Sequence, residues 1–249
     1  MPAQIDHLSF LQPSDENIKL WRYMDFTKFV SLISSNALFF NRSDLFEDPF
    51  EGSSPRMNPL LRQTHLENHM SEDNAQRSAQ AYGDIISSNR KWTYINCWHA
   101  NNHESAAMWK LYSKTNESIA IETTYVDLKN ALQDDVYLGL VKYIDYNREV
   151  IPERTLFDPF MHKRKSFEHE KEVRAVLQRP PISGGEIHLH RENKNSGVNI
   201  DVGINQLIKK IYVAPGSPNW FFELTKEISD KYDVQANVKK SNLMDEPVF

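Results

Sequence analysis

The clearest alternation of polar and apolar positions lies at residues 170–177, where the run Glu-Lys-Glu-Val-Arg-Ala-Val-Leu predicts a β-strand. Side chains of a strand point to alternate faces, so Glu172 and Arg174 share one face, while Val173 and the apolar residues after it share the other. Glu170 joins the charged face if the strand begins that early. The charged face has two interpretations: a salt-bridged exterior, which is common on an open strand, or a set of side chains that holds a polarised sugar or a metal.

Other alternating and helical patterns predict a mixed order of strands and helices. The chain has a first strand at residues 19–23, and apolar residues then recur at helical spacing from 26 to 33. Further along, a Pro-Gly-Ser-Pro turn at 215–218 precedes a helix at 220–231. Further strands are predicted at 37–40, 93–98, 118–123, 136–146, 187, 198–202 and 210–213, and further helices at 105–112, 124–132, 156–165 and 204–209.

Residues 57–91 differ from their surroundings because they are polar and contain only scattered Leu and Met. This pattern predicts one or two exposed helices that act as an insertion or lid. No linker rich in Pro, Gly or Ser divides the 249 residues, so we expect one domain that spans residues 1–249. The predicted fold class is α+β: a mixed, strongly bent β-sheet with helices on its flanks and a polar helical insertion at residues 57–91.

The composition is that of a folded globular protein, with 40% hydrophobic, 25% charged and 11% aromatic residues. Cys97 is the only cysteine, which excludes an intramolecular disulfide. We find neither a signal peptide nor an apolar stretch of about 18 residues, so we expect a cytoplasmic protein with no membrane partner. The net charge of −5 argues against a protein that binds nucleic acid through its overall electrostatic field. The basic clusters at 163–165 and 239–240 are interpreted as solvent-exposed faces.

Two common kinds of site find little support in the residue spacing. The 8 glycines form neither a P-loop nor a dinucleotide fingerprint, which argues against a P-loop ATPase and a Rossmann enzyme. A zinc site needs four converging ligands. The lone cysteine lies in an apolar strand, where it is interpreted as a buried side chain that packs in the core. The candidate ligands considered are Cys97, His99, His103 and Glu104.

Four blocks of residues stand out in order along the chain. The first is Trp21-Arg22-Tyr23, and the second is the Asp-Pro-Phe-Glu loop at 48–51. The third joins residues 96–99 to a Met-Trp…Tyr helix at 104–112, and the fourth runs from Lys163 to Arg174 and ends in a Glu-x-Glu-x-Arg strand. Together these blocks resemble the bacterial family catalogued as domain of unknown function number 2971, over residues 21–243. The name of that family assigns no activity.

The order of a basic residue on the first strand, a helix, an aromatic block and a Glu-x-Glu strand is also similar to ADP-ribosyltransferase folds. That resemblance implies that NAD is the substrate. Glu172 would bond the nicotinamide ribose and stabilise an oxocarbenium-like centre as the C–N bond breaks, and Glu170 would orient or deprotonate the acceptor. The residues that would hold NAD are Arg22, Tyr23, Trp109 and Tyr112, and those that would bind the rest of the substrate are Asp48, Glu51 and Arg174.

The chain departs from the transferase pattern because it lacks a clear Ser-Thr-Ser strand and because Arg174 can neutralise Glu172. Three hypotheses follow. The first is an NAD-dependent ADP-ribosyltransferase or NAD glycohydrolase, a toxin or phage-defence effector with a protein or nucleic acid as acceptor. The second is a non-catalytic sensor with structural ion pairs. The third is a metal-dependent nuclease or phosphodiesterase with Mg²⁺ held by Asp44, Asp48, Glu51, Glu170 and Glu172.

Overall fold

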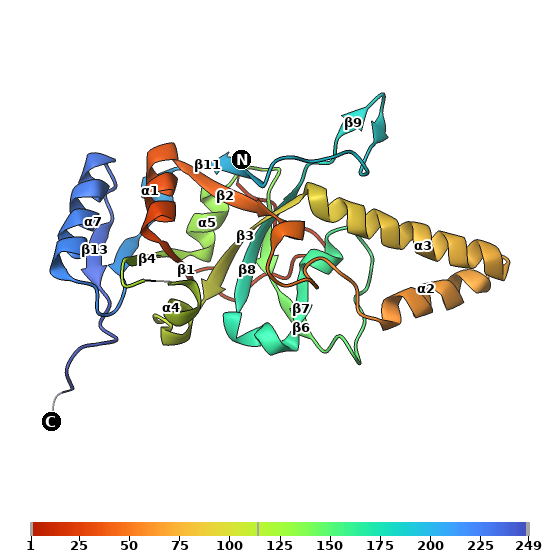
Figure 1. Cartoon of the computed structure of the whole chain (residues 1–249), viewed down its shortest axis with the longest axis horizontal. Helices are drawn as coiled ribbons and strands as arrows, with labels where there is room; N and C mark the ends of the chain where they lie inside the picture. The colour runs from red at the N-terminus through yellow and green to blue at the C-terminus, as the bar shows by residue number, and fades with distance from the viewer. Residues whose placement is uncertain (1, 114, 248–249) are drawn as a thin grey trace.

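A mixed sheet of nine strands forms the centre of the computed structural model, which describes residues 2–113 and 115–247 (Figure 1). Seven strands follow the order β11-β2-β3-β1-β4-β12-β13, while β8 pairs with both β3 and β5. The pairs are antiparallel except for β12 with β13. The strands are β1 (Lys19–Asp25), β2 (Ala37–Arg42), β3 (Thr93–Ala100), β4 (Ser118–Thr124), β5 (Tyr137–Leu140), β8 (Glu172–Gln178), β11 (Gly197–Asp201), β12 (Lys210–Val213) and β13 (Asn237–Lys240).

Helices flank this sheet, and two of those in the described residues begin where a side chain caps the first turn. The hydroxyl of Ser105 accepts the N–H of Met108, and that of Thr124 accepts the N–H of Asp127. These helices are α1 (Phe26–Ser35), α4 (Ala106–Tyr112), α5 (Tyr125–Ala131), α6 (Ile204–Leu207) and α7 (Asn219–Lys231). The short elements are η1 (Ser43–Leu45), η2 (Arg90–Trp92), η3 (Asp158–Phe160), η4 (Lys165–Glu170), and the paired strands β6 (Lys142–Ile144) with β7 (His162–Arg164) and β9 (Ile182–Ser183) with β10 (Glu186–Ile187).

A helical hairpin extends away from the body of the molecule (Figure 1). It consists of α2 (Met57–Glu67) and α3 (Glu72–Asn89), so the prediction of one or two exposed helices in this segment is confirmed. Few of its side chains are buried, which explains the polar sequence pattern. None of the helices in the described segments is both long and apolar enough to cross a membrane.

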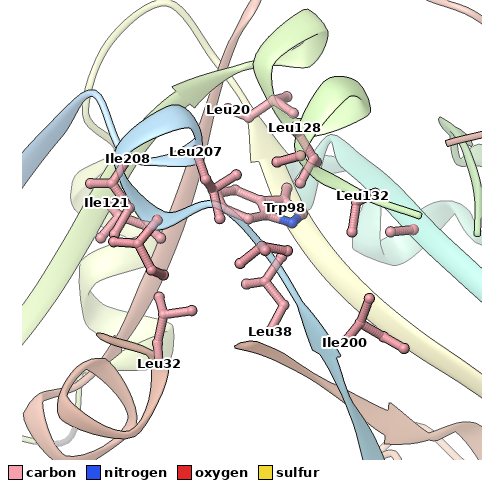
Figure 2. Close-up of a cluster of buried hydrophobic side chains, with 14 of the residues drawn as sticks. Leu20, Leu32, Leu38, Trp98, Ile121, Leu128, Leu132, Ile200, Leu207 and Ile208 are labelled. Atoms are coloured by element: carbon pink, nitrogen blue, oxygen red, sulfur yellow. The ribbon is translucent and has the colours of Figure 1, made fainter. Parts of the chain in front are cut away.

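The main core lies between one face of the sheet and the helices α1, α5 and α6. Trp98 of β3 lies at the centre of this core with 1% of its surface exposed. Figure 2 shows its indole ring among aliphatic side chains contributed by several elements. Burial of each large aliphatic side chain contributes roughly 1.5–3 kcal/mol relative to exposure, so this face holds the sheet rigidly. The surrounding residues include Leu20, Leu38, Leu128, Leu132 and Leu207.

The sheet is split where β1 and β2 both meet β3. Strand β2 pairs with β3 at Tyr94 and Ile95, whereas β1 pairs with β3 only at His99 and Ala100. Between these points β3 has no strand partner on that side, and the Asn96 amide bridges the opening by donating to a backbone carbonyl of β2 at 2.8 Å. The split therefore exposes strand edges and side chains from both faces of the sheet to one space.

Three predictions about the fold are wrong. We expected a strongly bent sheet, but the sheet is not strongly curled, because it opens by splitting at β3. The predicted helix at 156–165 is η3, β7 and the start of η4, since Pro159 lies in the first turn and the following residues pair with β6. The predicted strand at 136–146 is divided into β5 and β6.

Candidate functional site

A cavity of about 630 Å³ opens at the split in the sheet. This volume is within the usual range for small-molecule sites, roughly 300–1,000 Å³. Side chains from β1, β2, β3, α1, α4 and the start of β8 contribute to its wall. The lining residues that matter most for chemistry are Arg22, Tyr23, His99, Tyr112, Glu170 and Glu172.

The two glutamates reach the cavity because the backbone turns sharply between them. Lys171 has a left-handed conformation, with φ of 42° and ψ of 54°, which ends η4 and starts β8 at Glu172. Glu170 is therefore not part of the strand, contrary to one sequence interpretation. Both carboxylates nevertheless contact the same cation, because Lys163 Nζ hydrogen-bonds to Glu170 and lies 2.6 Å from Glu172 Oε1.

The charged face of β8 is buried, so its interpretation as a salt-bridged exterior is wrong. Arg174 has no exposed surface, and its two terminal nitrogens donate to both oxygens of Glu51 at 2.7 and 2.8 Å. Its Nε donates to Glu172 Oε2 at 2.5 Å, and Nη1 also donates to the carbonyl of Phe160. The face is covered because β8 is flanked by β3 and β5 and overlain by η3.

Lys163 is also buried, at 8% exposure, which corrects its interpretation as part of a solvated basic face. It lies on β7, directly opposite Tyr143 of β6. The Tyr143 hydroxyl accepts the backbone N–H of Glu172 at 2.8 Å. The small β6–β7 sheet thus positions both the lysine and the glutamate backbone, although the basic run at 163–165 alone does not reveal this role.

Charge balance in this cluster determines which carboxyl holds a proton. Among the described residues, Glu51, Glu170 and Glu172 pair with two cations, Lys163 and Arg174, so full ionisation leaves one excess buried negative charge. Burial, together with the hydrogen bond to Glu172 and its charge, raises the pKa of Glu170 to about 8. The pKa of Glu172 is held below its usual range: burial opposes ionisation, but the charges of Arg174 and Lys163 outweigh it.

Arg22 is a guanidinium on the cavity wall that has no carboxylate partner among the described residues. Its Cζ lies 5.9 Å from the ring centroid of Trp98. Burial lowers the pKa of Arg22 to about 10, so the group is still a cation at neutral pH. A half-buried cation without a counter-charge is suited to bind an anionic group of a ligand.

The aromatic candidates occupy two different environments. Tyr112 lines the cavity and is 44% exposed, which leaves its ring accessible for stacking. Tyr23 also lines the cavity, and its hydroxyl accepts the N–H of Ser105 at 2.9 Å. Trp109 is buried behind it, with ring centroids 4.9 Å apart in an edge-on arrangement, and its indole N–H donates to Glu104. Trp109 is thus a support for Tyr23 and not a lining residue.

The carboxylates of the loop before the helical hairpin do not line the cavity, although Phe46 of the same loop does. Asp48 pairs with Arg164 at 2.8 Å, and Asp44 pairs with Arg42 at 2.6 Å. Glu51 and Arg174 bind each other, and neither they nor Asp48 are lining residues. In residues 2–113 and 115–247 no group of three or more His, Cys, Asp or Glu side chains is arranged to hold a metal ion. Asp44, Asp48 and Glu51 each bind a cationic side chain.

His99 is a cavity residue for which we predicted no role beyond a weakly supported metal site. It lies opposite Glu172 in the β3–β8 ladder, and its Nδ1 is 2.6 Å from the carbonyl oxygen of Glu170. The sequence contains a partial signal, because His99 alternates with Cys97 on one face of a predicted strand. The strand pairing that brings it to Glu172 is a long-range contact, which a local pattern does not specify.

No family model matches the chain, and neither a curated protein nor a solved structure matches it. The resemblances to the domain of unknown function and to ADP-ribosyltransferases therefore stay predictions. The class of the protein is defined here by its fold, an α+β protein with a mixed sheet and a helical hairpin. The function is inferred from the cavity alone.

Proposed function

We propose that the cavity binds NAD and that the protein cleaves the bond between nicotinamide and ribose, transferring ADP-ribose to an acceptor or to water. The supporting observation is that Arg22, Tyr112 and the Glu170–Glu172 pair line one cavity, although they come from three distant parts of the chain. The proposed likeness to ADP-ribosyltransferase folds has the same basis, because the cavity lies at a split in a mixed sheet.

The charges on the cavity wall suit the two ends of such a ligand. Arg22 offers a cation to the pyrophosphate, and the exposed ring of Tyr112 offers a stacking surface. On the side of the split, no strand of the described residues pairs with β1 beyond Trp21, so the backbone groups of this edge are available to bond a carboxamide. Glu170 and Glu172 remain for the ribose between these groups.

Glu172 is suited to stabilise positive charge rather than to move a proton. When the C1′–N bond breaks, its electron pair leaves with the nicotinamide nitrogen, and the ribose becomes an oxocarbenium-like cation. A carboxylate whose pKa is held low stays ionised beside this developing charge, and fixed charges of this kind act mainly in the transition state. Lys163 and Arg174 keep the carboxylate in place.

Glu170 is suited to accept the proton of the incoming nucleophile. Neutral nicotinamide leaves without protonation, so the reaction needs a base for the acceptor O–H or water but no acid. The acceptor oxygen forms a bond to C1′, and its proton passes to the carboxylate of Glu170. A pKa of about 8 makes Glu170 a stronger base than an ordinary glutamate once it is ionised.

Release of free nicotinamide from NAD tests the proposal. The wild-type protein should release nicotinamide, Glu170→Gln should lower the rate by about 100-fold or more, and Glu172→Gln should abolish release. Glu186→Gln, an exposed carboxylate on β10, is the matched control and should retain full activity. Circular dichroism shows whether each variant is folded. Release that persists in folded Glu172→Gln protein would refute the catalytic assignment.

A second function, a sensor that binds the same ligand without cleaving it, is favoured by one specific observation. Both oxygens of Glu172 are held by cations, Lys163 at 2.6 Å and Arg174 at 2.5 Å, which reduces the negative charge available to a substrate. Saturable binding of NAD with no nicotinamide release from the wild-type protein would support the sensor and exclude the enzyme.

A further inference from the structure

His99 occupies the centre of a row of side chains that crosses three strands. It is the direct partner of Trp21 in the β1–β3 ladder and of Glu172 in the β3–β8 ladder. Side chains of directly opposed residues project from the same face of a sheet, with Cβ atoms about 5 Å apart. All three residues line the cavity, so His99 lies beside the carboxylate to which the catalytic role is assigned.

A single hydrogen bond determines the protonation pattern of the His99 ring. Its Nδ1 lies 2.6 Å from the backbone carbonyl of Glu170. A carbonyl oxygen only accepts, so Nδ1 has the proton and donates it. Burial lowers the pKa of His99, opposed by this bond, and the charges of Lys171 and His169 lower it further, so the ring is neutral at pH 7. Nε2 then has a lone pair and no proton.

This Nε2 lone pair has no partner within the described residues. The side chain is 96% buried, from a relative exposure of 4%, and Nε2 is a buried polar atom without a hydrogen bond. Buried acceptors are nearly always satisfied, and leaving one unpaired is unfavourable. His99 lines the cavity, but Nε2 itself has almost no accessible surface, so a donor on a bound molecule reaches it once a neighbouring side chain of the cavity wall shifts.

We propose that Nε2 of His99 accepts a hydrogen bond from the bound ligand and makes the site selective for a ligand with a donor beside Glu172. This inference rests on the proposed function. In NAD, the donor is either a hydroxyl of the nicotinamide ribose or the N–H₂ of the carboxamide. Both present the same chemistry to Nε2. A ligand with an acceptor at that position meets lone-pair repulsion and binds weakly.

Nitrogen NMR of protein labelled with ¹⁵N-histidine tests this contact directly. The free protein should show an unprotonated Nε2 and a protonated Nδ1 for His99. Addition of NAD should move the Nε2 resonance upfield, as expected when a lone pair accepts a hydrogen bond, and leave Nδ1 protonated. If NAD shifts other resonances to saturation while His99 Nε2 stays unchanged, the inference is wrong and NAD binding survives. If NAD shifts no resonance, both fail.

Two substitutions provide the affinity measurement. His99→Leu removes the acceptor and should weaken NAD binding by about tenfold or more, whereas His99→Gln keeps one donor and one acceptor and should bind within a few fold of wild type. Equal losses in both folded variants would overturn the proposed role. Titration with nicotinic acid adenine dinucleotide separates the donors: its affinity should match that of NAD if the hydroxyl is the donor and fall if the amide is.

Discussion

At the scale of single residues, the proton on Glu170 is the most consequential feature of the site. Glu172 shares its two oxygens between Lys163 and Arg174, while the Glu170 carboxyl contacts a single cation, Lys163, among the described residues. Protonation of the Glu170 carboxyl therefore neutralises the excess negative charge of the cluster. Two neighbouring carboxyls with pKa values displaced in opposite directions are typical of acid–base sites.

The rate of nicotinamide release should depend on the ionisation of Glu170. Only the carboxylate form accepts a proton, so we expect the rate to rise with pH, to reach half of its maximum near pH 8 and to level off about one pH unit above that. The measurement is the initial rate between pH 6 and 9.5. In Glu170→Gln, the residual rate should be independent of pH over this range. A wild-type rate that is flat from pH 6 to 8 would exclude Glu170 as the base.

The two glutamates should differ in their contributions to stability. Glu172→Gln leaves Lys163 and Arg174 short of one buried negative charge, and breaking a buried ion pair in this way costs about 3–5 kcal/mol. Glu170→Gln replaces a carboxyl that at pH 7 is largely protonated in the folded protein but ionised in the unfolded chain, so it should not destabilise the protein and should raise the free energy of unfolding. Urea denaturation at pH 7 compares them, and equal destabilisation would contradict the assigned charges.

The protonation of Glu170 also determines the sign of the pH dependence of stability. The folded-state pKa of Glu170 exceeds the ordinary value of 4.5, so the folded protein binds more protons between about pH 4.5 and 8. The stabilisation from that proton is complete below the unfolded pKa and is lost as pH rises through the folded pKa. Glu170→Gln should remove this part of the slope, and an unchanged slope would show that Glu170 is not the group responsible.

Lys171 determines how the two glutamates are oriented, through its backbone. A left-handed conformation is unfavourable for a residue with a Cβ and more so for a β-branched one. Lys171→Ile should therefore destabilise the protein by about 1–2 kcal/mol in urea unfolding, while Lys239→Ile, at an exposed position of β13, should be close to neutral. A neutral Lys171→Ile would show that the turn is not strained.

At the scale of elements, α2 of the helical hairpin contacts the body through the loop segment 151–153. Asn58 of α2 exchanges two hydrogen bonds with the backbone of Ile151. Arg62 of α2 pairs with Glu153 at 2.5 Å and stacks on Tyr82 of α3 at 4.3 Å. The contacts of Asn58 and Arg62 tie the hairpin to the loop that leads into η3, beside the buried ion pairs.

Removal of the Arg62–Glu153 ion pair should increase local unfolding of the hairpin and leave the sheet unaffected. Arg62→Ala should increase amide hydrogen exchange in α2 and α3 by about tenfold or more, because few apolar side chains hold these helices. Exchange in β3 and β8 should not change. Arg77→Ala, an exposed arginine on α3, is the control and should leave every element unchanged. Equal acceleration in the sheet would mean that the hairpin and the body unfold as one unit.

Several elements could be predicted from local pattern, and the failures have a common cause. The first strand, the strand at 93–98 and the helix at 220–231 agree with β1, β3 and α7, because each has a clear period and a recognisable boundary. The segment 156–170 was not predictable in this way. Its backbone is satisfied by pairing with β6, which is specified by long-range contacts and not by propensity.

At the scale of the whole molecule, the site depends on an opening in the sheet that no single segment encodes. Arg22 and Glu172 were named from their residue types and order, and the structure brings both to one cavity. The burial of Arg174 and Lys163, and the place of His99 between Trp21 and Glu172, depend on register across β1, β3 and β8. A sequence pattern identifies faces of strands, but it does not identify neighbours.

The central claim, that this cavity binds NAD, is tested most directly by calorimetric titration of the protein with NAD. We expect saturable one-site binding to the wild type and at least tenfold weaker binding to Arg22→Gln, which breaks no ion pair among the described residues. Arg191→Gln, at an exposed position away from the cavity, should bind as the wild type does. No heat of binding to the wild type, or equal affinity in Arg22→Gln, would contradict the claim.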